Sequence, residues 1–304
     1  MSIATAPRPG SPLPRLATWT LWLLGALLLV FVVAVPMDVV QQMVFSAVLF
    51  AVAWFLRRRG GRVVVLMMMG LSLAVSSRYI WWRLTQTMGV GGFTDLVLGL
   101  GLVGAELYAF MILVLGYFQV LWPLNRKPVP LPADQRDWPT VDVFIPTYNE
   151  PLAVVRTTVL AATVMDWPAD KIKVHVLDDG RRPEFREFCE AVGVNYVTRT
   201  NNFHAKAGNI NAALKKATGE YVAIFDCDHI PTRSFLQVAM GWFMRDAKLA
   251  VVQTPHYFFS ADPFERNLGT HGKVPNEGEL FYGLLQDGND QWDATFFCGS
   301  CTVI

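Results

Sequence analysis

The stretch Y-V-A-I-F-D-C-D-H at residues 221–229 has the composition of a short buried strand that ends in two carboxylates. Residues two apart on an extended strand end point the same way, so Asp226 and Asp228 can face one cation. Hard divalent ions such as Mg²⁺ or Mn²⁺ take oxygen ligands and usually share them with a phosphate. The plainer interpretation of an isolated D-x-D is a strand end with solvated acids. The rest of the chain has to decide between the two.

Around this stretch the sequence alternates between strand-like and helix-like segments. We expect strands at residues 141–146, 172–177, 196–199, 221–225, 249–253 and 301–304. We expect helices at residues 152–165, 183–192, 205–217 and 232–243. This rhythm predicts an open, mostly parallel sheet covered by helices. The strand at 301–304 comes last, and we expect it to be left without a partner.

Polar clusters follow four of the predicted strands. They are T-Y-N-E at 147–150, D-D-G at 178–180, H-A-K-A-G at 204–208 and D-C-D at 226–228. The carboxyl ends of parallel strands share one edge of a sheet, and such sheets bind ligands there. Carboxylates at this edge can accept hydrogen bonds from a base and a ribose, and Lys206 at a helix start suits a phosphate. With a metal held by the D-x-D, the pattern predicts a nucleotide-diphosphate site.

The half of the chain before residue 123 is strongly apolar. The chain has 304 residues, 53% of them hydrophobic, with a mean hydropathy of +0.32, and the excess is concentrated in this half. Segments 16–35, 39–56, 63–82 and 96–121 each approach the ~20 residues needed to cross a bilayer, so we expect four transmembrane helices within residues 16–122. A lead at 1–15 precedes them, and a proline-rich linker at 123–139 connects them to a domain at 140–304.

The basic residues indicate an orientation in the membrane. Arg8 and Arg15 precede the first apolar segment, R-R-R-G-G-R at 57–62 follows the second, and R-K at 126–127 follows the fourth. By the positive-inside bias, the N-terminus and the 140–304 domain are cytoplasmic. The net charge of +1 gives no argument for a nucleic-acid partner. Four irregularly spaced cysteines indicate a reducing compartment.

The apolar half contains charged residues inside or near the ends of the spans and a glycine-rich motif. Arg78 and Glu106 indicate either a polar pathway through the helices or hydrogen bonds between helices, and the sequence leaves both open. G-L-G-L-V-G at 99–104 matches the dinucleotide-binding fingerprint, but it lies inside a continuous apolar segment. That fingerprint requires a preceding strand, so we assign these small residues to helix packing.

Seven motifs in order resemble those of the catalytic subunits of bacterial cellulose synthases. They are T-Y-N-E, D-D-G, H-A-K-A-G, F-D-C-D-H, Q-T-P at 253–255, F-Y-G at 281–283 and F-F-C-G-S at 296–300. These subunits are processive family 2 glycosyltransferases with a GT-A fold. The resemblance therefore implies an α-helical transmembrane region followed by an α/β, Rossmann-like GT-A domain that is incomplete in this chain.

The resemblance also implies roles for individual residues. Those that would bind the UDP part of the donor are Thr147, Tyr148, Glu150, Asp178, Asp179, His204, Lys206 and Asp226. Asp226 and Asp228 would hold Mg²⁺, with Mn²⁺ as the alternative. Those that would line the acceptor end of the glucan are Phe296, Phe297, Cys298, Gly299 and Ser300.

The implied reaction is inverting transfer of glucose from UDP-glucose to the growing end of a β-1,4-glucan, coupled to translocation through the bacterial inner membrane. The family's catalytic base is the Asp of a T-E-D motif, and this sequence contains none. We therefore expect an N-terminal portion of a longer synthase that is inactive alone. The implied partners are the lipid bilayer and a periplasmic synthase subunit, with cyclic di-GMP acting only through a domain this sequence lacks. The alternatives are a hyaluronan or chitin synthase, or a non-catalytic membrane subunit that binds nucleotide or acts as a scaffold.

Overall fold

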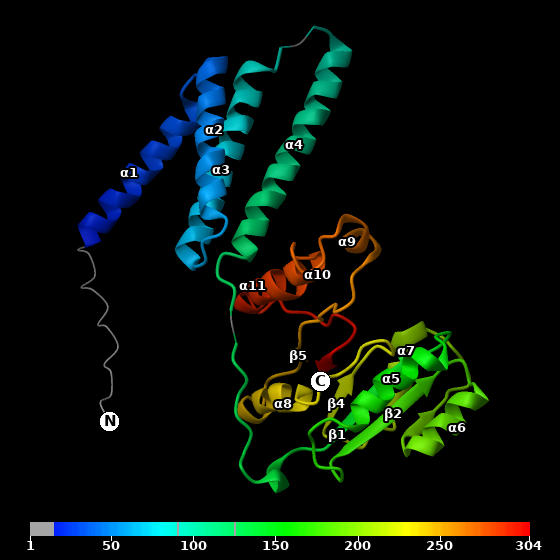
Figure 1. The fold of residues 1–304 in the computed structure, drawn as a ribbon. Helices are drawn as coiled ribbons and strands as arrows, with labels where there is room; N and C mark the ends of the chain where they lie inside the picture. The colour runs from blue at the N-terminus through cyan, green and yellow to red at the C-terminus, as the bar shows by residue number, and fades with distance from the viewer. Residues whose placement is uncertain (1–14, 90, 125) are drawn as a thin grey trace, which may run out of the picture. The chain divides into compact units, whose positions relative to one another are not determined.

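The computed structural model describes residues 15–304 except 90 and 125, and the chain divides after Leu121 into two compact units. The first unit contains the helices α1 (Arg15–Ala34), α2 (Val39–Leu56), α3 (Arg62–Gln86) and α4 (Phe93–Gln119), which are shown in Figure 1. Helices α2, α3 and α4 are long and apolar enough to cross a membrane. Within α1, the shorter stretch Leu23–Ala34 is apolar, and a span over residues 16–35 stays a prediction. The fingerprint at 99–104 lies inside α4, as expected.

Arg78 and Glu106, two charged residues of the apolar helices, make hydrogen bonds to neighbouring helices or their ends. Arg78 on α3 donates to Gln42 Oε1 on α2 at 2.9 Å and to the carbonyl oxygen of Val35, which follows α1, at 2.8 Å. Glu106 on α4 accepts from Arg83 on α3 at 2.8 Å. Because both charged groups are satisfied by neighbouring helices, the structure supports the interhelical interpretation of these residues.

The second unit is built on a six-stranded sheet with the order β3-β2-β1-β4-β6-β5. The strands are β1 (Val141–Thr147), β2 (Ile172–Asp178), β3 (Asn195–Val197), β4 (Tyr221–Ile224), β5 (Val252–Gln253) and β6 (Thr302–Val303). Strands β1 to β4 pair in parallel, as predicted for an open, mostly parallel sheet. The helices are α5 (Leu152–Thr163), α6 (Pro183–Val192), α7 (Ala205–Leu214), α8 (Phe235–Arg245), α9 (Pro263–Leu268), α10 (Glu277–Glu279) and α11 (Gln286–Gln291). A π-helical turn, Leu280–Leu285, joins α10 to α11.

The expectation that the last strand is left without a partner was wrong. Strand β6 runs antiparallel between β4 and β5 and pairs with both. Its residues satisfy the backbone groups of β4 on the side away from β1, which would otherwise be exposed at an edge. The segment that comes last in the chain therefore lies inside the sheet.

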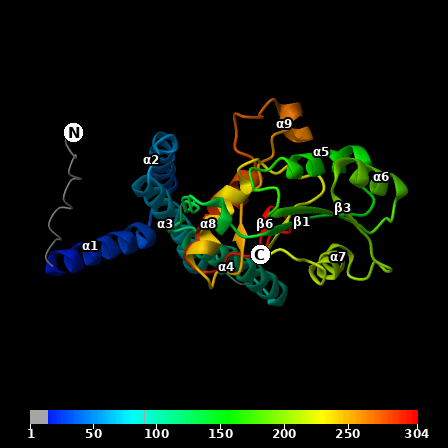
Figure 2. The same cartoon turned by 90° about the horizontal axis from the view of Figure 1, so that it is seen from below.

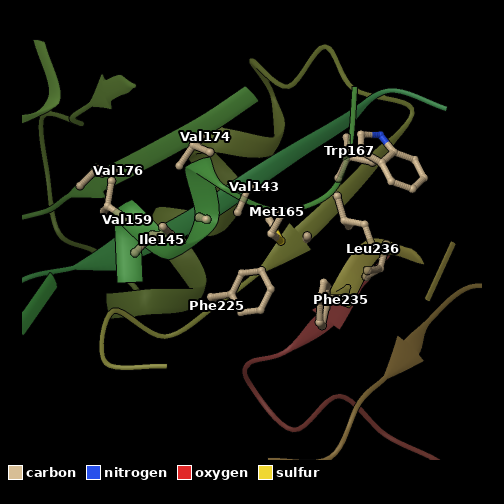
Figure 3. Close-up of a cluster of buried hydrophobic side chains, with 14 of the residues drawn as sticks. Val143, Ile145, Val159, Met165, Trp167, Val174, Val176, Phe225, Phe235 and Leu236 are labelled. Carbon is tan, nitrogen blue, oxygen red and sulfur yellow. The ribbon is translucent and has the colours of Figure 1, made fainter. Parts of the chain in front are cut away.

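Alternating residues of β1 face two different layers of helices. Val143 and Ile145 belong to a core that includes Val159 of α5 and Phe235 of α8, whereas Phe144 packs in a second core with α7. Figure 2 shows α5 and α6 on one side of the strands and α7 on the other, and Figure 3 shows side chains of the larger core. This alternation is expected for a sheet buried on both faces, and it leaves the strand ends open for a site.

Candidate active site

A cavity of about 460 Å³ opens where β1, β2 and β4 end and α7 begins. It is lined by Pro146, Thr147, Tyr148, Glu150, Asp179, Asn202, Ala205, Lys206, Asn209, Asp226, Cys227 and Asp228. The structure thus brings together residues from all four polar clusters that follow the predicted strands. Asn202 and Asn209 are the polar lining residues that were not predicted, although Asn209 directly follows H-A-K-A-G.

The end of β1 supplies an organised carboxylate. Glu150 Oε2 accepts hydrogen bonds from the Tyr148 N–H at 2.8 Å and from the Thr147 hydroxyl at 2.7 Å. Burial opposes ionisation of Glu150, but the hydrogen bonds outweigh it and lower its pKa. Glu150 is therefore ionised at neutral pH and held in one orientation beside the cavity.

The two carboxylates that end β2 have different environments. Asp178 is completely buried and accepts from Arg182 Nη2 and from the Tyr196 hydroxyl, each at 2.9 Å. It does not line the cavity, so its predicted contact with the donor stays a prediction. Asp179 does line the cavity, and Arg199 holds it with two hydrogen bonds of 2.7 and 2.6 Å.

The start of α7 lies close to the D-x-D. Lys206 Nζ forms an ion pair with Asp226 and donates to the carbonyl oxygen of Gly299 at 2.5 Å. A Cβ at Gly208 would collide with the carbonyl oxygen of Phe203, which explains the last residue of H-A-K-A-G. His204 has a left-handed backbone with φ of 62° and an exposed side chain that does not line the cavity.

The D-x-D is anchored through its backbone on both sides of the sheet end. The Asp226 N–H donates to Ser300 Oγ at 2.8 Å, and the Cys227 carbonyl accepts from the Thr158 hydroxyl at 2.8 Å. The Asp228 side chain remains 65% exposed. Potential ligand atoms of Asp226, Asp228 and His229 lie within 4.8 Å of one another. Two carboxylates at this spacing fit a hard divalent cation, which prefers oxygen ligands.

The predicted acceptor residues 296–300 lie beside the cavity and do not line it. Phe296 and Phe297 are about half exposed, whereas Ser300 is completely buried. Gln253 holds this segment, because its Oε1 accepts from the Cys298 N–H at 2.9 Å and its Nε2 donates to the Ser300 carbonyl at 2.8 Å. The segment is therefore connected to the D-x-D through Ser300 and to α7 through the contact of Gly299 with Lys206.

Several supporting residues were not predicted from the sequence. The ends of the strands are held by Arg182, Arg199 and Thr158. None of the three belongs to the polar clusters that follow the predicted strands. Arg182 lies four residues after Asp178, a spacing that could have suggested an ion pair. The sequence offered no comparable signal for Arg199 or Thr158, because their contacts depend on the path of the chain.

An open α/β sheet with paired carboxylates, a lysine and a helix start around one cavity at its strand ends is the architecture of a GT-A glycosyltransferase domain. The model of the family described as "Glycosyl transferase family 2" matches residues 142–304. This match covers more than half of the chain, and the chain belongs to that family.

The chain is similar to UDP-forming cellulose synthase catalytic subunits of two bacteria. The protein from Xanthomonas axonopodis pv. citri (strain 306) is 83% identical over 99% of this chain, which covers 41% of that protein. The protein from Pseudomonas fluorescens (strain SBW25) is 60% identical over 92% of this chain and 38% of its own length. This chain thus spans about two fifths of each relative. Among solved structures, a mannosyltransferase of Pyrobaculum calidifontis in complex with GDP-Man and Mn²⁺ is 30% identical, with a TM-score of 0.39, over 46% of this chain and 42% of its own.

Proposed function

We propose that this chain carries the donor-binding part of a cellulose synthase, an enzyme that transfers glucose from UDP-glucose to a β-1,4-glucan. The observation that carries the proposal is the convergence of Thr147, Glu150, Asp179, Lys206 and the D-x-D on one cavity. The names of relatives that are 83% and 60% identical support the choice of polymer over hyaluronan or chitin.

Within this proposal, different residues of the cavity bind different parts of the UDP-glucose donor. Glu150 and Asp179, each fixed by neighbouring hydrogen-bond donors, accept hydrogen bonds from the uracil and ribose. Asp226 and Asp228 would hold the cation, Mg²⁺ or Mn²⁺, which would neutralise charge on the diphosphate. Lys206 exchanges its contact with Asp226 for a phosphate oxygen and stabilises the leaving diphosphate from the start of α7.

The acceptor side of the reaction involves the segment 296–300. We propose that Phe296 and Phe297 contact the sugar rings of the glucan end and that Cys298 lies near its terminal hydroxyl. An acceptor hydroxyl needs a general base, which the family takes from a T-E-D motif. The sequence of this chain contains no T-E-D. The proposal is therefore that the chain binds the donor and does not complete transfer alone.

The cellular setting is also part of the proposal. Three apolar helices long enough to span a membrane support a multi-pass membrane protein. We place it in the bacterial inner membrane with its N-terminus and glycosyltransferase unit in the cytoplasm, because the basic residues cluster on that side of the spans. Its partners would be the glucan, the bilayer and a periplasmic synthase subunit.

The test is UDP binding to the purified chain in lipid nanodiscs, measured by titration calorimetry with and without Mg²⁺. We expect saturable binding that strengthens with Mg²⁺ and an Asp228→Asn variant that loses this Mg²⁺ dependence. Asp170→Asn is the matched control, since Asp170 is exposed and does not line the cavity. Failure to bind UDP, or equal loss in both variants, would contradict the donor site. Incorporation of glucose into polymer by this chain alone would contradict the proposed division of the active site.

A further inference from the structure

A second group of ligand-type side chains lies directly beside the D-x-D. His229 follows β4, His256 follows β5, and Cys301 precedes β6. One potential ligand atom from each lies within 4.8 Å of the other two, and all three residues are partly buried. Pairing of β6 with β4 and β5 brings these distant parts of the chain together. Unlike the D-x-D, the group offers two imidazoles and a thiol.

The spacing of these atoms matches tetrahedral zinc coordination. Zinc bonds of about 2.3 Å to sulfur and about 2.0 Å to nitrogen place these two ligands about 3.5 Å apart in a tetrahedron. The observed distance from Cys301 Sγ to His229 Nδ1 is 3.7 Å. The ring of His256 lies 4.6 Å from that of His229, inclined by 68°. A side-chain rotation that moves a ring nitrogen of His256 by on the order of 1 Å brings all three ligand atoms to the separations of a tetrahedral zinc site.

The other nitrogen of His229 faces a carboxylate. His229 Nε2 lies 4.0 Å from Asp228 Oδ1. Histidines that bind metals commonly donate their second ring N–H to a carboxylate, which fixes the tautomer and strengthens the ligand. A metal on Nδ1 leaves Nε2 to carry the proton, and the Asp228 carboxylate 4.0 Å away is a neighbouring group that can orient the ring.

We propose that His229, His256 and Cys301 form a binding site for a thiophilic divalent cation, with Zn²⁺ as the ion that fits it. The soft sulfur and imidazole ligands select zinc over magnesium. Three protein ligands leave the fourth position of a tetrahedron for water.

Three features of the metal-free site oppose binding: one contact of each histidine with Ser300, and the proton on the Cys301 thiol. His229 Nδ1 lies 2.7 Å from Ser300 Oγ, a contact that the metal replaces. His256 Nε2 lies 3.0 Å from the Ser300 carbonyl oxygen, a contact that rotation of this ring has to break. Burial raises the pKa of the Cys301 thiol to about 11, so the thiol carries its proton at neutral pH. Binding then exchanges one proton for the metal: the S–H bond breaks, a Zn–S bond forms and H⁺ is released to solvent.

The test uses Co²⁺ as a spectroscopic probe on the whole chain in nanodiscs, with reductant and without nucleotide. We expect one equivalent of Co²⁺ to produce a thiolate-to-cobalt charge-transfer band and the visible bands of tetrahedral coordination, and a small excess of Zn²⁺ to abolish both. Cys301→Ser and His256→Asn should each remove the charge-transfer band or weaken Co²⁺ binding at least tenfold. Cys298→Ser and His271→Asn, which change the same residue types outside the cluster, should leave it in place.

A charge-transfer band that survives Cys301→Ser, or one that Cys298→Ser removes, would overturn the assignment. So would the absence of any such band in the unaltered chain. If a variant fails to fold, X-ray absorption at the zinc edge on the unaltered chain decides the matter, because the site predicts one sulfur and two nitrogen scatterers. The measurement needs no UDP, so its failure is distinguishable from failure of the proposed donor site.

Discussion

Replacing Thr158 by valine tests how the D-x-D is held. Thr158 is completely buried on α5, and its hydroxyl donates to the Cys227 carbonyl, between the two carboxylates, at 2.8 Å. Valine has nearly the same shape and no donor, so the variant leaves a buried carbonyl without this partner. Loss of a buried hydrogen-bond partner costs about 1–3 kcal/mol. That range corresponds to roughly 5- to 160-fold faster exchange of amides that exchange only when the unit unfolds.

Hydrogen exchange followed by mass spectrometry on the chain in nanodiscs measures this effect. The informative peptide covers residues 221–228, which contain the Phe225 N–H that donates to the Phe144 carbonyl at 3.0 Å. The matched control is Thr163→Val, because Thr163 lies on the same helix with an exposed side chain whose hydroxyl donates to the Leu160 carbonyl. Surface changes of this kind stay within about 0.5 kcal/mol. Equal exchange rates in the two variants would refute the idea that this contact holds the D-x-D.

Three further predictions follow from the site and its surroundings. Lys206→Met should weaken Mg²⁺-dependent UDP binding roughly 10- to 150-fold, the range for a hydrogen bond to a charged group, whereas Lys215→Met at the exposed end of α7 should not. Asp142 has a lowered pKa, because hydrogen bonds from the Thr218 and Gly219 N–H groups outweigh the effect of its burial. The ionised form of Asp142 therefore stabilises the folded unit at pH values above the unfolded pKa of about 4, and this stabilisation is lost as the pH falls through the lower folded pKa. In a plot of the free energy of unfolding against pH, Asp142→Asn should therefore reduce the slope on the acid side. Iodoacetamide at mildly alkaline pH should modify Cys298 before Cys227, because Cys227 is buried with a pKa raised by burial to about 12; peptide mass spectrometry that finds the reverse order would contradict this.

Much of the fold could be predicted because its boundaries are set by local chemistry. Helix α6 covers the predicted residues 183–192, since it begins at Pro183 and ends before Gly193, which adopts the left-handed conformation with φ of 72°. Helix α2 also matches its prediction, and the Asp38 side chain caps its start. The place of β6 could not be predicted, because strand pairing is decided by parts of the chain far apart in sequence. The predicted strand at 249–253 was also too long, since only Val252–Gln253 pairs with β6.

The site was predictable to the extent that it follows one rule of parallel sheets. Because strands end at a common edge, the residues after β1, β2 and β4 could be assigned to one place before their contacts were known. The residues that hold these side chains by hydrogen bonds could not be assigned in this way. Arg199 reaches Asp179 only because the chain turns back after β3, and Ser300 holds the Asp226 N–H only because β6 lies next to β4. From the sequence, Ser300 was predicted to line the acceptor end of the glucan. Nothing in the F-F-C-G-S motif indicated that its hydroxyl accepts a hydrogen bond from the D-x-D.

The position of β6 also determines when during synthesis the site can form. The pairings among strands β1 to β4 are complete once about residue 225 has been made. The hydrogen bond that anchors the Asp226 N–H comes from Ser300, 74 residues later in the chain. At translation rates of about 5–20 residues per second, this separation corresponds to several seconds. During that interval a nascent chain can pair its first four strands while β4 still has an open edge, so the anchor of the D-x-D from Ser300 is added only after those strands have formed.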